Sequence, residues 1–407
     1  MNCRSCNAPL TEVFVDLGMS PLSNAYIRAD QLGAPEVFFP LDVRVCSECF
    51  LVQLPEYEAP DVIFGDYAYF SSYSDSWLKH ASEYVSMITP RLGLGPQSHV
   101  VEIASNDGYL LQYFVDIGVP VLGIEPADSV AQAAIKKGIP TIVEFFGESL
   151  GRRLASEGQL ADLVIGNNVL AHVPNLNDFV AGVKALLTPT GVATFEFPHL
   201  LHLVDRLEFD TIYHEHFSYF SFITVRSVFE RHGLTLFDVE ELESHGGSLR
   251  IYAKHTEDRS KDVLAAVEGL IDRERAAGFD SIETYRGFQP LVEAAKREIL
   301  AFLIQAKNEG KRVVGYGAPA KGNTLLNYCG VRTDLIEYTV DRNPHKRDKF
   351  LPGTHIPVYA PEKIFEDQPD YVMVLPWNLK EEIIGQNLGI AEWGGRFVLP
   401  LPRVEVL

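Results

Sequence analysis

Short apolar stretches alternate with amphipathic stretches through the middle of the chain. SHVVEIAS, PVLGIEPA, PTIVEFFG, ADLVIGNN and VATFEFP are apolar runs typical of buried strands. Between them, segments such as DSVAQAAIKKG and FVAGVKALLTPTG place apolar residues at helical spacing. This alternation predicts an α/β fold with a parallel, doubly wound sheet, whose ligand lies beyond the carboxyl ends of the strands.

Further helices and a second α/β unit are predicted on either side of this pattern. SDSWLKHASEYVSMITPRLG reads as a helix capped by Ser74 or Asp75, and SFITVRSVFERHGL as a helix closed by Gly233. HGGSLRIYAKH reads as a turn into a strand, and residues 256–310 as a charged helical connection. From residue 312 a second strand–loop–helix pattern begins, RVVGYGAPAKGNTLLNYCG.

Four of the five cysteines form two C-x-x-C pairs, Cys3 with Cys6 and Cys46 with Cys49. Such a pair aims two thiolates at one centre, and two pairs supply the tetrahedral S4 set that suits zinc. Four thiolates leave no open position, so we expect structural zinc. We expect Cys329 to be a small buried hydrophobe.

Composition and charge narrow the function classes. The 407 residues are 46% hydrophobic and 22% charged, with a formal charge of −20. A protein with this negative charge repels the phosphate backbone, which argues against a nucleic-acid partner. No apolar run of about 18 residues appears, and MNCRSCNAPL does not resemble a secretory signal, so we expect a cytoplasmic protein without a membrane partner.

Two loops follow strands in the manner of nucleotide-binding turns. The first runs from Glu102 to Gly108, and Glu125 ends the next strand, where it could accept ribose hydroxyls. Its acidic character suits S-adenosyl-L-methionine (SAM), a cation without phosphate. The second, GYGAPAKG, fits G-x-G-x-x-A, with Asp341 ending the next strand and Lys321 suited to a diphosphate.

The segment DTIYHEHFSYFS holds the densest candidate chemistry. Tyr213, His214, Glu215 and His216 could form a metal site, an acid–base site or a polar strand edge. A strand would pair Tyr213 with Glu215 on one face, whereas a helical turn would pair Tyr213 with His216. His172 follows the fourth strand, so we expect it at the same carboxyl edge of the sheet as this segment. The aromatic segment with Tyr67 and Tyr69 reads either as a packed linker or as a wall of the cleft.

Taken together, these motifs resemble the SAM-dependent sugar C-methyltransferases that modify nucleotide-linked 4-keto deoxysugars, such as those of antibiotic pathways. The resemblance spans the chain and rests on CRSC with CSEC, EIASNDG, GNNVLAHVPN, YHEHFSYFS, HGGSLR, GYGAPAKGNTLLNYCG and VDRNPHK. It implies a zinc module (1–65), a class I SAM-methyltransferase Rossmann-like domain with a helical linker (66–285), and a C-terminal Rossmann-like domain that binds the nucleotide sugar (286–407).

The resemblance also implies roles for individual residues. His216 is the preferred base, Tyr213 its partner or the alternate base, and Glu215 and His172 orient the sugar or the base. The cofactor set is Glu102, Ala104, Asn106, Gly108, Glu125, Asn167 and Asn168. The substrate set is Tyr67, Tyr69, Gly317, Lys321, Asn323 and Asp341.

The predicted reaction is methylation at C3 of a dTDP-linked 4-keto deoxysugar through an enolate, by a monomer or a weak homo-oligomer. Three alternatives remain at this point. A sugar O-methyltransferase needs only a base near a hydroxyl. A nicotinamide-dependent oxidoreductase would use the G-x-G-x-x-A loop. A non-catalytic binding protein would keep the zinc module with inactive α/β domains.

Overall fold

The computed structural model describes residues 1–58 and 70–407 and divides the chain into two compact units. Unit 1 comprises Met1–Leu10, Cys46–His199 and Phe217–Ser281; unit 2 comprises Thr11–Val45, Leu200–His216 and Ile282–Leu407. Each unit is therefore assembled from three separate stretches of sequence. The expected domains are contiguous, and their boundaries stay a prediction. Tyr67 and Tyr69 lie outside the described residues.

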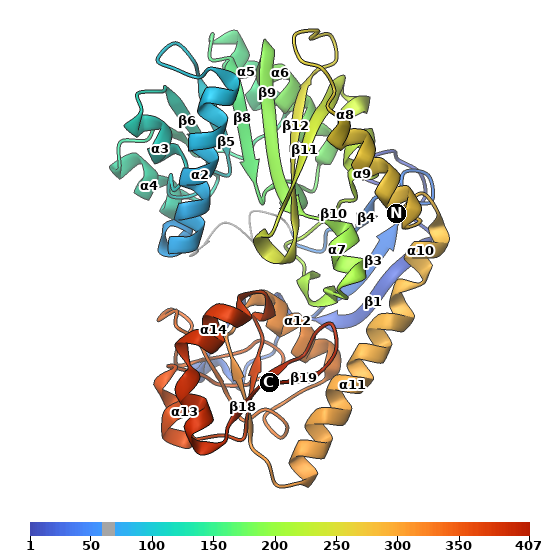
Figure 1. Cartoon of the computed structure of the whole chain (residues 1–407), viewed down its shortest axis with the longest axis vertical. Coiled ribbons are helices and arrows are strands. Elements are labelled where there is room, and N and C mark those ends of the chain that lie inside the picture. Colours follow the sequence, from blue (N-terminus) through green and yellow to red (C-terminus); the bar gives the residue numbers. More distant parts are fainter. Residues whose placement is uncertain (59–69) are drawn as a thin grey trace. The chain divides into compact units, whose positions relative to one another are not determined.

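Unit 1 is built around a seven-stranded sheet in the order β11-β12-β9-β8-β5-β6-β7 (Figure 1). Strands β5 to β9 run parallel, as the alternating pattern predicts. Strand β12 is antiparallel to both of its neighbours, β11 and β9. It follows β11 after a short turn, and such a connection requires that this pair be antiparallel.

The helices and strands of unit 1 follow one another along its three stretches of chain. They are β4 (Val52–Gln53), α2 (Asp75–Leu92), β5 (Val100–Ile103), α3 (Leu111–Asp116), β6 (Val121–Ile124), α4 (Asp128–Lys136), β7 (Thr141–Ile142), α5 (Glu148–Ser156), β8 (Ala161–Asn167), α6 (Leu176–Leu186), β9 (Leu187–Pro198), β10 (Ser218–Tyr219), α8 (Phe222–Arg231), β11 (Leu234–Leu242), β12 (Ser248–His255) and α9 (Ala265–Ala276). Ser74 caps α2 by accepting the Trp77 N–H, as expected.

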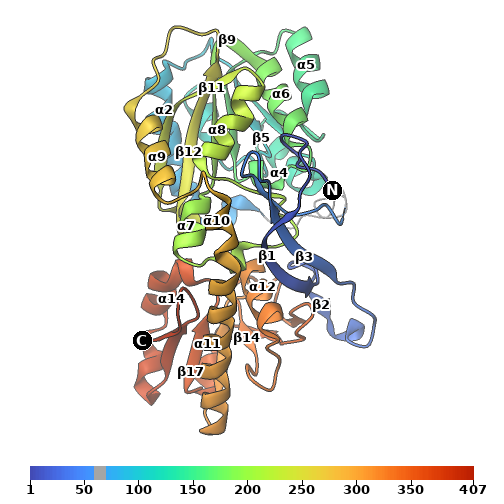
Figure 2. The ribbon, with the colours of Figure 1, turned by 90° about the vertical axis from the view of Figure 1, so that its right-hand side faces the viewer.

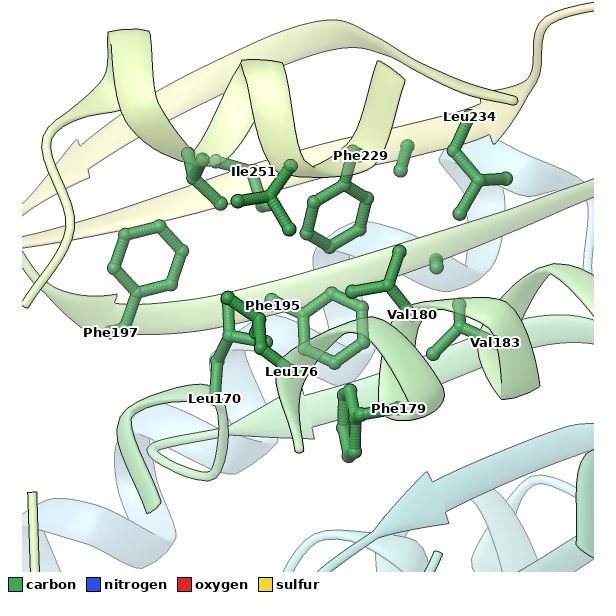
Figure 3. Packing of buried hydrophobic residues seen from close by; sticks show 14 of the residues in the cluster. Leu170, Leu176, Phe179, Val180, Val183, Phe195, Phe197, Phe229, Leu234 and Ile251 are labelled. Atoms are coloured by element: carbon green, nitrogen blue, oxygen red, sulfur yellow. The ribbon is translucent and has the colours of Figure 1, made fainter. Parts of the chain in front are cut away.

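Strand β9 separates the two layers of core in unit 1. Phe195 and Phe197 pack on the side of α6 and α8, where the ring of Phe195 lies 5.6 Å from that of Phe229 and 5.8 Å from that of Phe179 (Figure 3). Thr194, on the opposite face, lies 2.7 Å from the Tyr84 hydroxyl of α2. Side chains alternate along a strand, so each layer receives every second residue. Both faces of the sheet are therefore covered by helices.

Unit 2 contains a six-stranded sheet in the order β16-β14-β13-β17-β18-β19. It is parallel except for β19. Its elements are β1 (Glu12–Ser20), β2 (Ile27–Arg28), β3 (Phe39–Val45), α7 (Leu200–Asp205), α10 (Ile282–Arg286), α11 (Phe288–Asn308), β13 (Val313–Tyr316), α12 (Ala320–Cys329), β14 (Thr339–Val340), β15 (Lys349–Phe350), β16 (Val358–Tyr359), α13 (Glu362–Asp367), β17 (Tyr371–Val374), α14 (Lys380–Gln386), β18 (Arg396–Leu399) and β19 (Glu405–Val406).

The long gap between the cysteine pairs is an insertion that folds into unit 2. Strands β1 and β3 pair antiparallel, and β1 packs on α11 through the stacked rings of Phe14 and Phe288, 4.6 Å apart (Figure 2). Strand β2 pairs with β15, which matches Ile27 to Phe350. Among the described helices of both units, none combines the length and apolar content needed to cross a membrane.

Candidate functional site

The four paired cysteines come together in unit 1. Their Sγ atoms all lie within 4.8 Å of one another, with 3.6 Å between Cys3 and Cys49 and 3.4 Å between Cys6 and Cys46. A zinc ion held by four thiolates at about 2.3 Å places the sulfurs about 3.8 Å apart. The donor set therefore fits a structural zinc site and confirms the expected grouping.

The two cysteine pairs share one local structure. The Asn7 N–H donates to the Cys3 carbonyl and the Phe50 N–H to the Cys46 carbonyl, each at 2.9 Å. Asn7 and Phe50, the residues that follow each pair, both have positive φ, at 64° and 58°. The same tight reversal thus brings both sulfurs of each pair to a common centre.

The loop after β5 has an unusual backbone. Ala104, Asn106 and Gly108 all have positive φ, at 55°, 48° and 76°. A Cβ at Gly108 would lie 2.3 Å from Cδ1 of Ile139, so conformation and space both require glycine there. Strained backbone of this kind collects at ligand sites, and this loop stands at the carboxyl end of the first strand, where such sheets bind ligands.

Glu125 holds this loop through both of its carboxylate oxygens. Its Oε2 accepts the Asn106 N–H at 3.0 Å and its Oε1 accepts the Ala127 N–H at 2.9 Å. Burial raises the pKa of Glu125, while the two backbone donors lower it. Each oxygen has a further lone pair, so the fixed carboxylate can still accept the two hydroxyls of a ribose.

Buried acceptors beside this loop lack donors. Oε2 of Glu102 and Oδ1 of Asn168 have no hydrogen-bond partner in the part of the chain that the structure describes. Glu102 is 1% exposed, and burial raises its pKa well above the usual range, although the Tyr109 hydroxyl lowers it. Asn167, at the end of β8, also bonds Tyr109. An unmet buried acceptor costs about 1–3 kcal/mol, so the residues present fit SAM, whose ammonium and hydroxyl groups are donors.

Residues 213–216 of DTIYHEHFSYFS form a turn in unit 2, so the strand alternative for Tyr213 to His216 is wrong. Later in the same segment, Ser218–Tyr219 form β10 in unit 1. The His216 N–H donates to the Tyr213 carbonyl at 2.9 Å, and the two rings lie 4.1 Å apart between centroids. Nδ1 of His216 lies 3.0 Å from the Thr211 carbonyl oxygen. A carbonyl can only accept, so Nδ1 carries the proton and Nε2 of the neutral ring keeps its lone pair.

The two middle residues of this turn are buried and differ from their neighbours. His214 is 4% and Glu215 7% exposed, whereas Tyr213 and His216 are half-buried. Nε2 of His214 lies 3.2 Å from the Pro40 carbonyl, and burial lowers its pKa. Among the described residues, no group of three metal ligands includes any member of this turn. The arrangement therefore favours acid–base chemistry over a metal site.

The G-x-G-x-x-A loop of unit 2 repeats the arrangement around Glu125. Asp341 accepts the Ala318 N–H through Oδ2 and the Asn343 N–H through Oδ1, both at 2.8 Å. Gly317 has φ 86°, and a Cβ there would lie 2.5 Å from Cδ of Pro376. The Asn323 amide donates to the Ser23 carbonyl at 2.6 Å, so it anchors the insertion as well as standing in the loop's helix.

Lys321 already has charged and aromatic partners. Its Nζ donates to Oδ1 of Asn378 at 2.8 Å and stands 4.1 Å above the Trp377 ring. Burial raises the pKa of Glu208 to about 8 and of Asp210 to about 6, and the Lys321 charge lowers both. Burial lowers the pKa of Lys321, while the charges of Asp210 and Glu208 raise it.

Sequence reasoning placed some site residues and missed others. His172 ends a short 3-10 helix, Leu170–His172, directly after β8 in unit 1. Asn24 and Tyr26, from the insertion, contact the Glu215 carboxylate and the Ala318 carbonyl of unit 2. Their only sequence signal is the unusual length of the gap between the cysteine pairs, which does not say where the inserted residues go.

Comparisons with known proteins show the family to which the chain belongs. Family models match a zinc binding domain at residues 3–64, a methyltransferase domain at 77–239 and a C-methyltransferase C-terminal domain at 243–402. The C-methyltransferase NovU of Streptomyces niveus is 37% identical over 405 residues, covering 100% of this chain and 96% of that protein.

Solved structures resemble part of the chain. A SAM-dependent methyltransferase from Clostridium acetobutylicum is 11% identical with a TM-score of 0.36, covering 44% of this chain and 92% of its own. The PH0226 protein from Pyrococcus horikoshii is 16% identical with a TM-score of 0.39, and the match covers 49% of this chain and 99% of that protein. With the whole-length relative and the three matched domains, this chain belongs to the SAM-dependent C-methyltransferase family, with a four-cysteine zinc-binding module at its N-terminus.

Proposed function

We propose that this protein methylates C3 of a dTDP-linked 4-keto deoxysugar. The observation that carries the proposal is the Tyr213–His216 turn, in which the two rings lie 4.1 Å apart and Nδ1 of His216 meets the Thr211 carbonyl. A hydrogen next to a ketone is acidic because the resulting enolate delocalises its charge. An imidazole titrates near working pH and suits this abstraction.

The chain's own groups then have defined roles. Nε2 of His216 takes the C3 proton, and the Tyr213 hydroxyl serves as its partner or as the alternate base. Glu215 and His172 orient the sugar or the base. Bound SAM would supply the electrophilic methyl group to the enolate carbon. His172 is included on the resemblance of GNNVLAHVPN to the family.

The nucleotide sugar is assigned to unit 2. Gly317, Asn323 and Asp341 stand in or beside its G-x-G-x-x-A loop. Asp341 already accepts two backbone N–H groups. Lys321 is the second residue of α12, at the end of the helix that favours an anion, which supports its assignment to the diphosphate. Lys321 would have to exchange its Asn378 contact for a phosphate oxygen in the complex. Family membership favours C-methylation over O-methylation and over nicotinamide chemistry.

Glu125→Gln tests the cofactor half of the proposal. The NH2 group of the new amide would face a backbone N–H that now donates to Glu125. One hydrogen bond that holds the loop and one acceptor for the ribose would therefore be lost. A hydrogen bond to a charged group contributes about 1.5–3 kcal/mol, which predicts about 10- to 100-fold weaker binding of S-adenosylhomocysteine by calorimetry. Glu144→Gln, which removes only a surface ion pair with Arg153, is the matched control. Equal affinity in both variants would refute the role of Glu125.

The overall proposal is tested by incubating the protein with SAM and a dTDP-linked 4-keto deoxysugar in D2O. We expect S-adenosylhomocysteine, a product with a new carbon-bound methyl at C3 by NMR, and deuterium at C3 of unreacted sugar. Methyl on oxygen, or no S-adenosylhomocysteine with any 4-keto sugar, would overturn it.

A further inference from the structure

The insertion between the two cysteine pairs is attached to unit 2 on both sides of Asn24. The Ser23 carbonyl accepts the Asn323 amide at 2.6 Å, and the Tyr26 hydroxyl donates to the Ala318 carbonyl. Strand β2 follows directly and pairs Ile27 with Phe350. These contacts fix the backbone around Asn24 to the loop and helix that open the unit 2 sheet.

Asn24 in turn contacts the buried acid of the candidate catalytic turn. Its Nδ2 donates to Oε1 of Glu215 at 2.6 Å. Glu215 is 7% exposed, while Asn24 itself is exposed. Burial raises the pKa of Glu215, and the Asn24 amide lowers it. The amide thus both orients one carboxylate oxygen and favours the charged form of a group that is next to His216 in sequence.

We propose that Asn24 is a positioning residue for proton abstraction, acting by fixing the Glu215 carboxylate in the turn that carries Tyr213 and His216. The inference rests on the proposed function, because it assigns Asn24 to that same site. The Asn24 amide donates to one of the two Glu215 oxygens, so it helps to set the orientation of the carboxylate. An asparagine supplies a neutral donor without adding a second charge.

A second part of the insertion also contacts the candidate catalytic turn. Glu215 lies in a turn whose buried side faces the insertion, as the His214 contact with the Pro40 carbonyl also shows. Two separate parts of the insertion, near Asn24 and near Pro40, therefore hold the two buried members of the turn. Tyr213 and His216, the other two members of the turn, are half-buried.

The test compares Asn24→Ala, Asn24→Asp and Asn24→Gln in the full-length enzyme. Aspartate keeps the shape of asparagine but places a carboxylate against Glu215, whereas glutamine keeps the amide donor. We expect kcat to fall about 10- to 100-fold in Asn24→Ala and Asn24→Asp, with partial recovery in Asn24→Gln. KM for SAM should stay unchanged, and deuterium exchange at C3, measured without methyl transfer, should fall in parallel with kcat.

Glu36→Gln is the control for mere loosening of the insertion. Glu36 attaches the same insertion to unit 2 by accepting the Gly353 N–H at 2.7 Å and by contacting His355, but it does not touch Glu215. If Glu36→Gln lowers kcat as much as Asn24→Ala, or if Asn24→Asp is as active as wild type, the positioning role is refuted. If the wild-type protein itself neither exchanges nor methylates a 4-keto sugar, it is the proposed function that fails.

Discussion

His216→Asn is expected to lower kcat for methyl transfer by about 10²- to 10⁴-fold, the range that a positioned general base contributes. The substitution is well matched to the structure. The asparagine amide can occupy the place of Nδ1 and donate to the Thr211 carbonyl, as His216 does at 3.0 Å. What it removes is Nε2, the atom assigned to take the proton. Binding of S-adenosylhomocysteine should be unchanged.

Deuterium exchange separates proton abstraction from methyl transfer in this variant. We expect exchange at C3 of the 4-keto sugar to fall with kcat in His216→Asn, and to fall less in Tyr213→Phe. The reverse order would make Tyr213 the base and His216 its partner. His255→Asn is the control, since His255 ends β12 in unit 1 with its Nε2 3.4 Å from the Leu187 carbonyl. Full activity in both site variants would remove the turn from the mechanism.

The turn itself shows what local sequence can and cannot decide. Tyr213 and His216 are three residues apart, a spacing compatible with a shared face only if the chain turns. The same letters in a strand would have paired Tyr213 with Glu215. The hydrogen bond from the His216 N–H to the Tyr213 carbonyl decides between them. The choice between turn and strand depends on the neighbouring structure and not on these four residues alone.

Local pattern predicts most elements of unit 1 because the central strands β5, β6 and β8 are almost entirely buried and the helices between them are amphipathic. Ser74 caps α2 as its side chain suggests, and Gly108 is required where the loop turns. Helix α5 and strand β11 were not predicted. The ESLGRRLAS segment of α5 is more polar than its neighbours, and β11 is an edge strand with polar residues at one end.

Long-range assembly was the part that the sequence did not show. The antiparallel place of β12 and the discontinuous units depend on pairings between distant stretches. The partners of Asn24 and Lys321 likewise lie far away in the chain. Hydrophobic periodicity does not identify such a partner, because it shows which face of a segment is buried and not which segment covers that face.

Loss of zinc is expected to have the largest effect on stability. Apparent binding free energies for structural zinc in small zinc-finger peptides are about 10–16 kcal/mol, comparable to the whole stability of a typical domain, about 5–15 kcal/mol. Cys3, Cys46 and Cys49 are buried and belong to the main hydrophobic cluster of unit 1. Cys46→Ser with Cys49→Ser should therefore abolish bound zinc, measured by plasma mass spectrometry, and lower Tm by calorimetry.

Cys329→Ser is the matched control, because this fifth cysteine is buried in α12 of unit 2 and outside the four-sulfur group. It should keep its zinc and show only the modest cost of a polar group in a core. If the double variant does not fold, a chelator on the wild-type protein gives the same test.

Amide hydrogen exchange then shows which parts of the chain the zinc stabilises. The Asn7 and Phe50 N–H groups close the two cysteine turns at 2.9 Å, and each turn stands at one end of the insertion that carries Asn24. With the sulfurs no longer held by a metal, each turn loses the bond that ties it to the other turn. Exchange should therefore rise first at Asn7 and Phe50, and then along 11–45, before it rises in β5, β8 and β9. Uniform exchange along the whole chain would instead mean that zinc supports only global folding.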